Sequence, residues 1–155
     1  MKIVRLASAI AVALVATTVA ANAATIGNCN GAMGIRYTAS ILDNSQTSST
    51  VFAAIPEGTV NFTQGHLGCV IVTFTAQVNS GSNRLGLRAF LDNTTVGTPF
   101  EVVLTMSIAS TETRTAVFVF SDVPAGAHTL KMQFSSPDTG AVTVMRHVTM
   151  VQYTK

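Results

Sequence analysis

Three histidines are the side chains of this sequence best suited to acid–base or metal chemistry, so their surroundings come first. His66 stands in the glycine-bounded stretch TQGHLG, which is typical of a loop residue. His128 follows the turn signal PAG (124–126) and shares the parity of the inward-facing apolar residues after it. We therefore expect His128 to begin a strand and to be hydrogen bonded to a nearby carbonyl or hydroxyl. His147 lies within the last apolar stretch and is predicted to be a solvated or cross-strand residue.

No catalytic or metal-binding motif surrounds these histidines. The sequence lacks the G-x-S-x-G turn and has no His-x-His or Cys-x-x-Cys pair, whereas zinc needs three or four converging ligands. Most acidic residues fall in turns or at strand ends, away from the paired arrangement that a glycosidase needs. We expect no enzymatic activity, no metal and no cofactor. A small extracellular hydrolase stays open as an alternative, and it would require a histidine and a carboxylate to converge.

Other ligand-binding chemistry would depend on a few loop residues and two tyrosines. Asp92-Asn93 or Asp138-Thr139 could offer oxygens to calcium, but the D-x-[DN]-x-[DN]-G pattern is absent. The chain has no tryptophan, so a sugar ring would have to pack on Tyr37 or Tyr153. These tyrosines fall in the first and last predicted strands, which could be neighbours. The candidate ligand-binding residues are Tyr37, Tyr153, Asp92 and Asn93, and a purely structural role for both tyrosines is the alternative.

The first residues predict a secretory signal peptide over 1–23 and a single domain over 24–155. Lys2 and Arg5 precede an uncharged apolar run, and Ala21-Asn22-Ala23 matches the small-x-small pattern before a cleavage site. The alternative is a retained membrane anchor, but the run is short for a bilayer span of roughly 20 residues. Removal of residues 1–23 would take two of the 9 basic residues and leave a nearly neutral chain with 7 acidic residues. Nucleic-acid binding and membrane insertion after cleavage are therefore not expected, and we predict a periplasmic or extracellular location.

Cys29 and Cys69 are the two cysteines of the chain. In an oxidising compartment two cysteines most simply form one disulfide, which here would close a loop of about 40 residues and stabilise the fold by roughly 3–4 kcal/mol. Two free thiols are the alternative.

Apolar residues alternate with polar ones along most of the remaining chain, with turn residues at short intervals, so the sequence predicts an all-β fold. The clearest case is 69–78, where one face is apolar and the other is mainly threonine and glutamine. In 113–120 both faces are apolar, which predicts a strand covered on two sides. The predicted strands are 33–42, 49–55, 69–78, 84–91, 99–108, 113–120, 128–134 and 141–153, with 59–63 as a short strand or an extension.

About eight strands favour an antiparallel two-sheet β-sandwich of the jelly-roll type, with an immunoglobulin-like sandwich as the alternative. The order IPEGTVNFT (55–63), GCVIVTFTAQV (68–78), LRAFLDN (87–93) and VPAGAHTLKMQF (123–134) resembles that of small secreted bacterial jelly-roll proteins. The segment PAGAHTLKMQF also resembles the penultimate strand of carbohydrate-binding sandwich modules. Neither resemblance implies particular active-site residues.

These observations predict a secreted, non-catalytic β-sandwich with a structural or protein-interaction role. The alternative is a carbohydrate-binding module that uses loops at one end of the sandwich. The apolar second faces of 113–120 and 141–153 also suggest a homo-oligomer that buries one sheet face.

Overall fold

The computed structural model describes residues 33–40, 44–105 and 110–155, and the regular structure in these residues is entirely β-strand. The predicted signal peptide and Cys29 lie outside the described residues. The strands are β1 (Met33–Ser40), β2 (Ser45–Thr47), β3 (Ala53–Gln64), β4 (Gly68–Asn79), β5 (Arg84–Leu91), β6 (Thr95–Val96), β7 (Val102–Thr105), β8 (Glu112–Val123), β9 (Gly126–Ser135) and β10 (Val142–Thr154).

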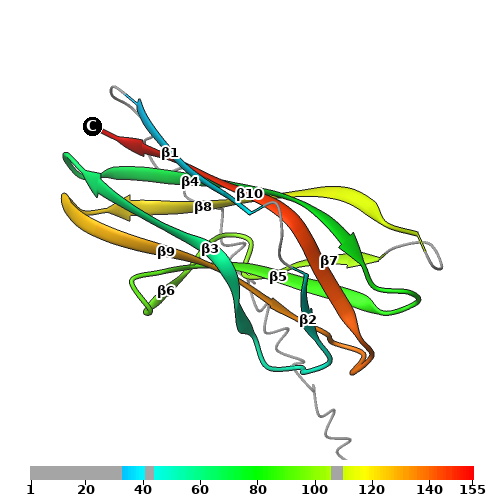
Figure 1. Ribbon diagram of the computed structural model, residues 1–155. Helices are drawn as coiled ribbons and strands as arrows, with labels where there is room; N and C mark the ends of the chain where they lie inside the picture. The colour runs from blue at the N-terminus through cyan, green and yellow to red at the C-terminus, as the bar shows by residue number, and fades with distance from the viewer. Residues whose placement is uncertain (1–32, 41–43, 106–109) are drawn as a thin grey trace, which may run out of the picture.

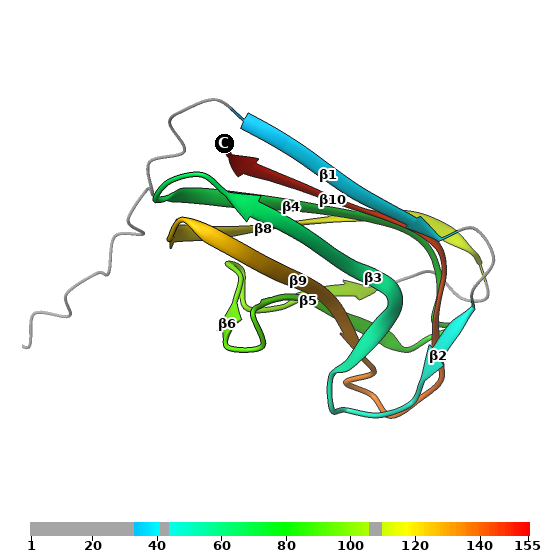
Figure 2. The same cartoon turned by 60° about the vertical axis from the view of Figure 1, so that its left-hand side comes forward.

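The strands form two antiparallel sheets that stack face to face, as Figure 1 and Figure 2 show. Sheet A has the order β1-β10-β4-β8, with β2 also paired to β10. Sheet B has the order β3-β9-β5-β6, with β7 also paired to β5. The chain crosses repeatedly between the sheets, and its first and last described strands pair with each other. This arrangement is that of a jelly roll and differs from the sheets of an immunoglobulin domain, so the predicted jelly-roll-like sandwich is confirmed.

Strand parity builds the core as the sequence predicts. The inward residues of β4 are buried: Val70, Val72, Phe74, Ala76 and Val78. The same holds for Leu85, Leu87, Ala89 and Leu91 of β5. Full burial of a large apolar side chain stabilises a fold by about 1.5–3 kcal/mol. The two sheets are therefore held together mainly by their inner faces.

Three details of the strands differ from the predictions. The segments 49–55 and 59–63 are not separate strands, because β3 runs from Ala53 to Gln64 through a bulge at Glu57. Glu57 has a φ of 55°, and the bulge sets the four residues 55–58 of β3 opposite one residue of β9, so the PEG sequence does not end the strand. The predicted loops 43–48 and 92–99 contain the short strands β2 and β6.

Candidate functional site

His128 and Asp92 form a histidine–carboxylate pair at the inner edge of sheet B. His128 Nδ1 lies 2.7 Å from Asp92 Oδ2, and Nε2 lies 2.9 Å from the carbonyl oxygen of Pro124. A carbonyl oxygen only accepts, so Nε2 must donate, and Nδ1 donates to the carboxylate. The carbonyl partner agrees with the prediction, while the carboxylate partner goes beyond it. The pair resembles half of a catalytic triad, but the ring nitrogen that would face a nucleophile is occupied by a carbonyl.

A tight turn between β5 and β6 places Asp92. Asp92 and Asn93 have φ of 50° and 57°, and they are the two central, left-handed residues of a turn that the Thr94 N–H closes on the Leu91 carbonyl at 3.0 Å. Asp92 Oδ1 accepts the Thr129 N–H at 2.8 Å, and Asn93 Oδ1 accepts Lys131 Nζ at 2.8 Å. Both residues proposed as ligand groups therefore already have protein partners, and they fasten the β5–β6 turn to β9.

The hydrogen bonds of this pair shift both pKa values in the direction that favours ions. Burial lowers the pKa of His128, but the hydrogen bonds to Asp92 and to Pro124 outweigh it and raise that pKa. Burial also raises the pKa of Asp92, but the Thr129 N–H and His128 outweigh it and lower that pKa. Both shifts favour the charged forms, so the two side chains form an ion pair between the lowered pKa of Asp92 and the raised pKa of His128.

Replacing Asp92 with asparagine is expected to lower the free energy of unfolding by about 1–2 kcal/mol near pH 5.5. Asparagine tolerates the same backbone conformation, so the change removes mainly the charge. Because the folded pKa of His128 is raised, its contribution is complete below about pH 6.5 and is lost as pH rises through the folded pKa. Because the folded pKa of Asp92 is lowered, its contribution is present above about pH 3.9 and is lost as pH falls.

Urea unfolding of both proteins from pH 3 to 9 measures this difference. The matched control is Asp122→Asn, since Asp122 has a similar φ of 55° and is exposed. The control should cost little at any pH. A difference for Asp92→Asn that stays constant across this range would contradict the ion pair.

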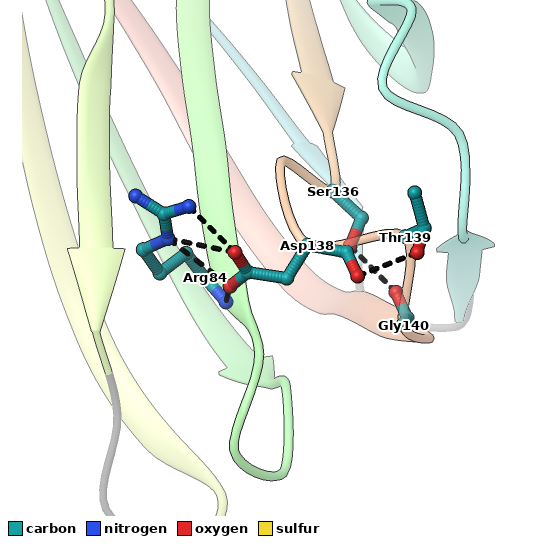
Figure 3. A network of polar contacts seen from close by, with 5 residues as sticks. All are labelled: Arg84, Ser136, Asp138, Thr139 and Gly140. Carbon is teal, nitrogen blue, oxygen red and sulfur yellow. Dashed lines mark hydrogen bonds and ion pairs between the residues drawn. The ribbon is translucent and has the colours of Figure 1, made fainter.

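Asp138, in the second candidate calcium loop, forms an ion pair with Arg84 (Figure 3). Arg84 donates to both carboxylate oxygens of Asp138 through its guanidinium and to Oδ2 through its backbone N–H. These hydrogen bonds lower the pKa of Asp138. The contact joins the start of β5 to the β9–β10 turn. In the part of the chain that the structure describes, no three or more His, Cys, Asp or Glu side chains gather as a metal site would require.

Tyr37 and Tyr153 lie on neighbouring strands but on opposite faces of sheet A. Tyr37 is opposite Met150 and Tyr153 is opposite Gly34, so the two rings are out of phase. Tyr37 is 72% exposed on the outer face, whereas Tyr153 is 7% exposed and packs against the Phe62 ring at 5.2 Å. The strands of the two tyrosines are neighbours, as expected, but the two rings cannot stack on one sugar.

Tyr153 does line a hollow near the histidine–carboxylate pair. The hollow has a volume of about 350 Å³ and is formed by strands β1, β3, β9 and β10. Its lining residues are Arg36, Asn61, Phe62, Thr63, Ala127, His128, Thr129 and Tyr153. Thr129 Oγ1 donates to Asn61 Oδ1 at 2.9 Å, which continues the polar contacts of Asp92 across to β3. Asn61-Phe62-Thr63 matches the N-x-T glycosylation pattern, whereas Arg36 had no motif to single it out.

The other two histidines differ from each other. His66 is exposed in the β3–β4 turn, as predicted. His147 is buried against Phe74, with Nδ1 at 3.1 Å from the Met145 carbonyl. Of the two roles expected for it, the solvated one is wrong, and the cross-strand one agrees with its position opposite Ser40 and Ala76. A bulge between Val144 and His147 changes the strand parity and turns His147 inward.

Cys69 is completely buried at the start of β4. Its proposed partner, Cys29, lies outside the described residues, so the Cys29–Cys69 disulfide stays a prediction.

The outer face of sheet A carries a broad uncharged surface, which we call the A face. Cross-strand register arranges it in three rows of four residues, one from each of β1, β10, β4 and β8. Each row is uncharged and two are mainly apolar. The rows are Ile35–Gln152–Ile71–Val119, Tyr37–Met150–Thr73–Val117 and Ala39–Val148–Thr75–Thr115. The hydroxyls of Thr75 and Thr115 hydrogen bond to each other at 3.0 Å, which leaves methyl groups for contact.

The A face corrects the prediction that 113–120 is covered on two sides. Phe118 and Phe120 are buried between the sheets, but Val117 and Val119 are exposed within the single chain. The phenylalanines are mostly core residues as expected, except that Phe100 is 63% exposed. The second apolar side of β8 thus has no cover from the described residues.

The fold and these sites define a jelly-roll β-sandwich with an apolar face on sheet A and a polar clamp on sheet B. The polar clamp is the set of contacts from Asp92 and Asn93 to His128, Thr129 and Lys131, which hold the β5–β6 turn to β9. No protein-family model matches the sequence. No curated protein matches it either. Among the described residues there is no helix long and apolar enough to cross a membrane.

Several solved structures share the general arrangement of strands. Dimeric latent PorU from Porphyromonas gingivalis has 12% identity and a TM-score of 0.49 over 83% of this chain. A structure of infectious bursal disease virus Gx strain aligns with 12% identity and a TM-score of 0.45 over 79% of this chain. The globular domain of zebrafish complement 1qA aligns with 14% identity and a TM-score of 0.43, also over 79% of this chain. This chain spans 14%, 32% and 93% of those chains, respectively. At such identities the likeness concerns the fold alone, and we base no argument about function on it.

Proposed function

We propose that this chain is a secreted, non-catalytic β-sandwich with a structural role, and that it assembles with copies of itself through the A face. The observation that carries the proposal is the absence of charge at all twelve register positions of the A face. Proteins that are monomeric in water rarely expose contiguous apolar patches larger than a few hundred Å². An apolar sheet face normally packs against a second layer.

A second copy is the occupant that the charges favour. Removal of the proposed signal peptide leaves equal numbers of basic and acidic residues, so two copies repel each other little. The A face is uncharged, so a like copy meets it without placing equal charges in contact. A strongly charged partner would gain nothing from this surface.

The size of the A face indicates a weak dimer. Four strands about 4.8 Å apart and three rows about 6.8 Å apart cover roughly 400 Å² as a flat area. Side-chain relief enlarges this area, which still falls near the lower end for specific complexes. A dissociation constant in the micromolar range is the expected result.

Light scattering and sedimentation of the purified protein from about 1 to 500 μM test this proposal. The mean mass should rise from that of a monomer toward that of a dimer within the range. The same preparation gives the intact mass, which should lack residues 1–23 if the signal peptide is removed. A monomer mass at every concentration would contradict assembly.

A further inference from the structure

A hollow borders the A face beside its third row. The hollow has a volume of about 290 Å³, and its outward-facing lining residues are Ala39, Thr75, Gln77, Thr113, Arg146 and Val148. The alternate residues Ser40, Ala76 and His147 also border it, but these residues are buried and belong to the inner side of the sheet. The depression follows from side-chain size, because the small Ala39 and two threonines stand among larger neighbours.

Tyr37 is an exposed aromatic side chain near this hollow. It is 72% exposed and stands on the second row, two residues from Ala39. A cavity of about 150 Å³ is enough to hold a benzene-sized ring, so a phenol ring can enter the hollow. Aromatic rings that fill such pockets are frequent centres of binding energy in interfaces.

We propose that Tyr37 of one copy inserts into this hollow of a second copy, and that the reverse contact forms at the same time. This inference rests on the proposed self-association and specifies its geometry. Strand spacing and rise place Tyr37 roughly 10 Å from the centre of the hollow. A two-fold axis midway between them satisfies both contacts at once and centres the interface on the A face. Such an isologous contact closes at two copies and does not continue into a filament.

The lining of the hollow suits tyrosine better than an aliphatic side chain. The guanidinium of Arg146 can lie over the ring face, which favours an aromatic ring. Gln77 and Thr113 offer amide and hydroxyl groups to the phenol oxygen, which needs a hydrogen-bond partner once buried. Arg146 is the one charged side chain among the residues that line the hollow.

Replacing Tyr37 with alanine is expected to raise the dissociation constant of the dimer about 100-fold, because the symmetric interface loses two anchors. Tyr37→Phe keeps the ring and should raise it less than about 10-fold. Phe100→Ala is the control, since Phe100 is also an exposed aromatic residue but lies outside the A-face rows. Sedimentation velocity of the full chain measures all three.

Tyrosine fluorescence gives a second readout that a merely structural role would not move. The chain has two tyrosines and no tryptophan, and Tyr153 is buried, so acrylamide quenching reports mainly on Tyr37. Quenching should fall as the protein associates. Unchanged quenching as the unmodified protein associates, or a dimer that survives Tyr37→Ala yet dissociates on Val117→Lys, would overturn this inference and leave the A face as the interface. A monomer at all concentrations would overturn both proposals.

Discussion

Replacing Val117 with lysine is expected to make the protein monomeric while leaving its melting temperature nearly unchanged at concentrations below the dissociation constant of the dimer. Val117 is 48% exposed in the second row of the A face, so the single chain accommodates lysine without a clash. In the dimer the same ammonium group would be buried without a partner, and the two-fold symmetry places this cost in the interface twice. An unpaired buried charge costs several kcal/mol, so the dissociation constant should rise by more than about 100-fold.

The matched control for this change is Val103→Lys. Val103 is 46% exposed on a strand of sheet B, so the substitution has the same chemistry and similar exposure on the other sheet. Sedimentation of both variants beside the unmodified protein separates a specific interface from a general effect of charge. Equal loss of association in both variants would contradict the A face as the interface.

Replacing Phe118 with alanine is expected to lower the stability of the single chain, whereas Val117→Lys affects only its association. Phe118 is the next residue along β8 but faces inward, with none of its surface exposed. Removal of a buried phenylalanine ring costs about 3–5 kcal/mol in the free energy of unfolding, a large part of the stability of a domain of this size.

Urea unfolding measures this cost most cleanly in the Val117→Lys background, where dimer dissociation does not add to the apparent stability. Phe100→Ala is the control, because a 63% exposed ring should contribute within about 0.5 kcal/mol. A loss below about 1 kcal/mol for Phe118→Ala would mean that the two sheets do not close around this ring.

Strand parity made much of the fold predictable. The alternation in β4 and β5 depends on local sequence alone, so their bounds and inward residues agree with the structure. Two of the bulges break that rule. At Glu57 a bulge joins two predicted segments into β3, and near His147 another turns a supposedly solvated side chain inward. The alternation of residues alone does not locate these bulges, because pairing with a distant strand decides where the extra residues lie.

The contact between Asp92 and His128 in the polar clamp could not be predicted from local sequence. The turn at Asp92-Asn93 and the strand start at His128 both carry local signals, yet 36 positions separate Asp92 from His128. Their contact exists only because β5 and β9 are neighbours in sheet B. Part of the A face could be predicted from the sequence, because the second apolar sides of β8 and β10 are evident there. Their union with Ile35 and Tyr37 required the strand order.

The central place of β10 in sheet A has a consequence for the synthesis of the chain. β10 lies between β1 and β4, although it is the last strand of the described chain to be synthesised (Figure 2). Until it emerges, β1 has no neighbour in its sheet and one edge of β4 stays unpaired. Nascent chains with open strand edges and exposed apolar faces are prone to aggregate. Sheet A can therefore be completed only after β10 has been translated.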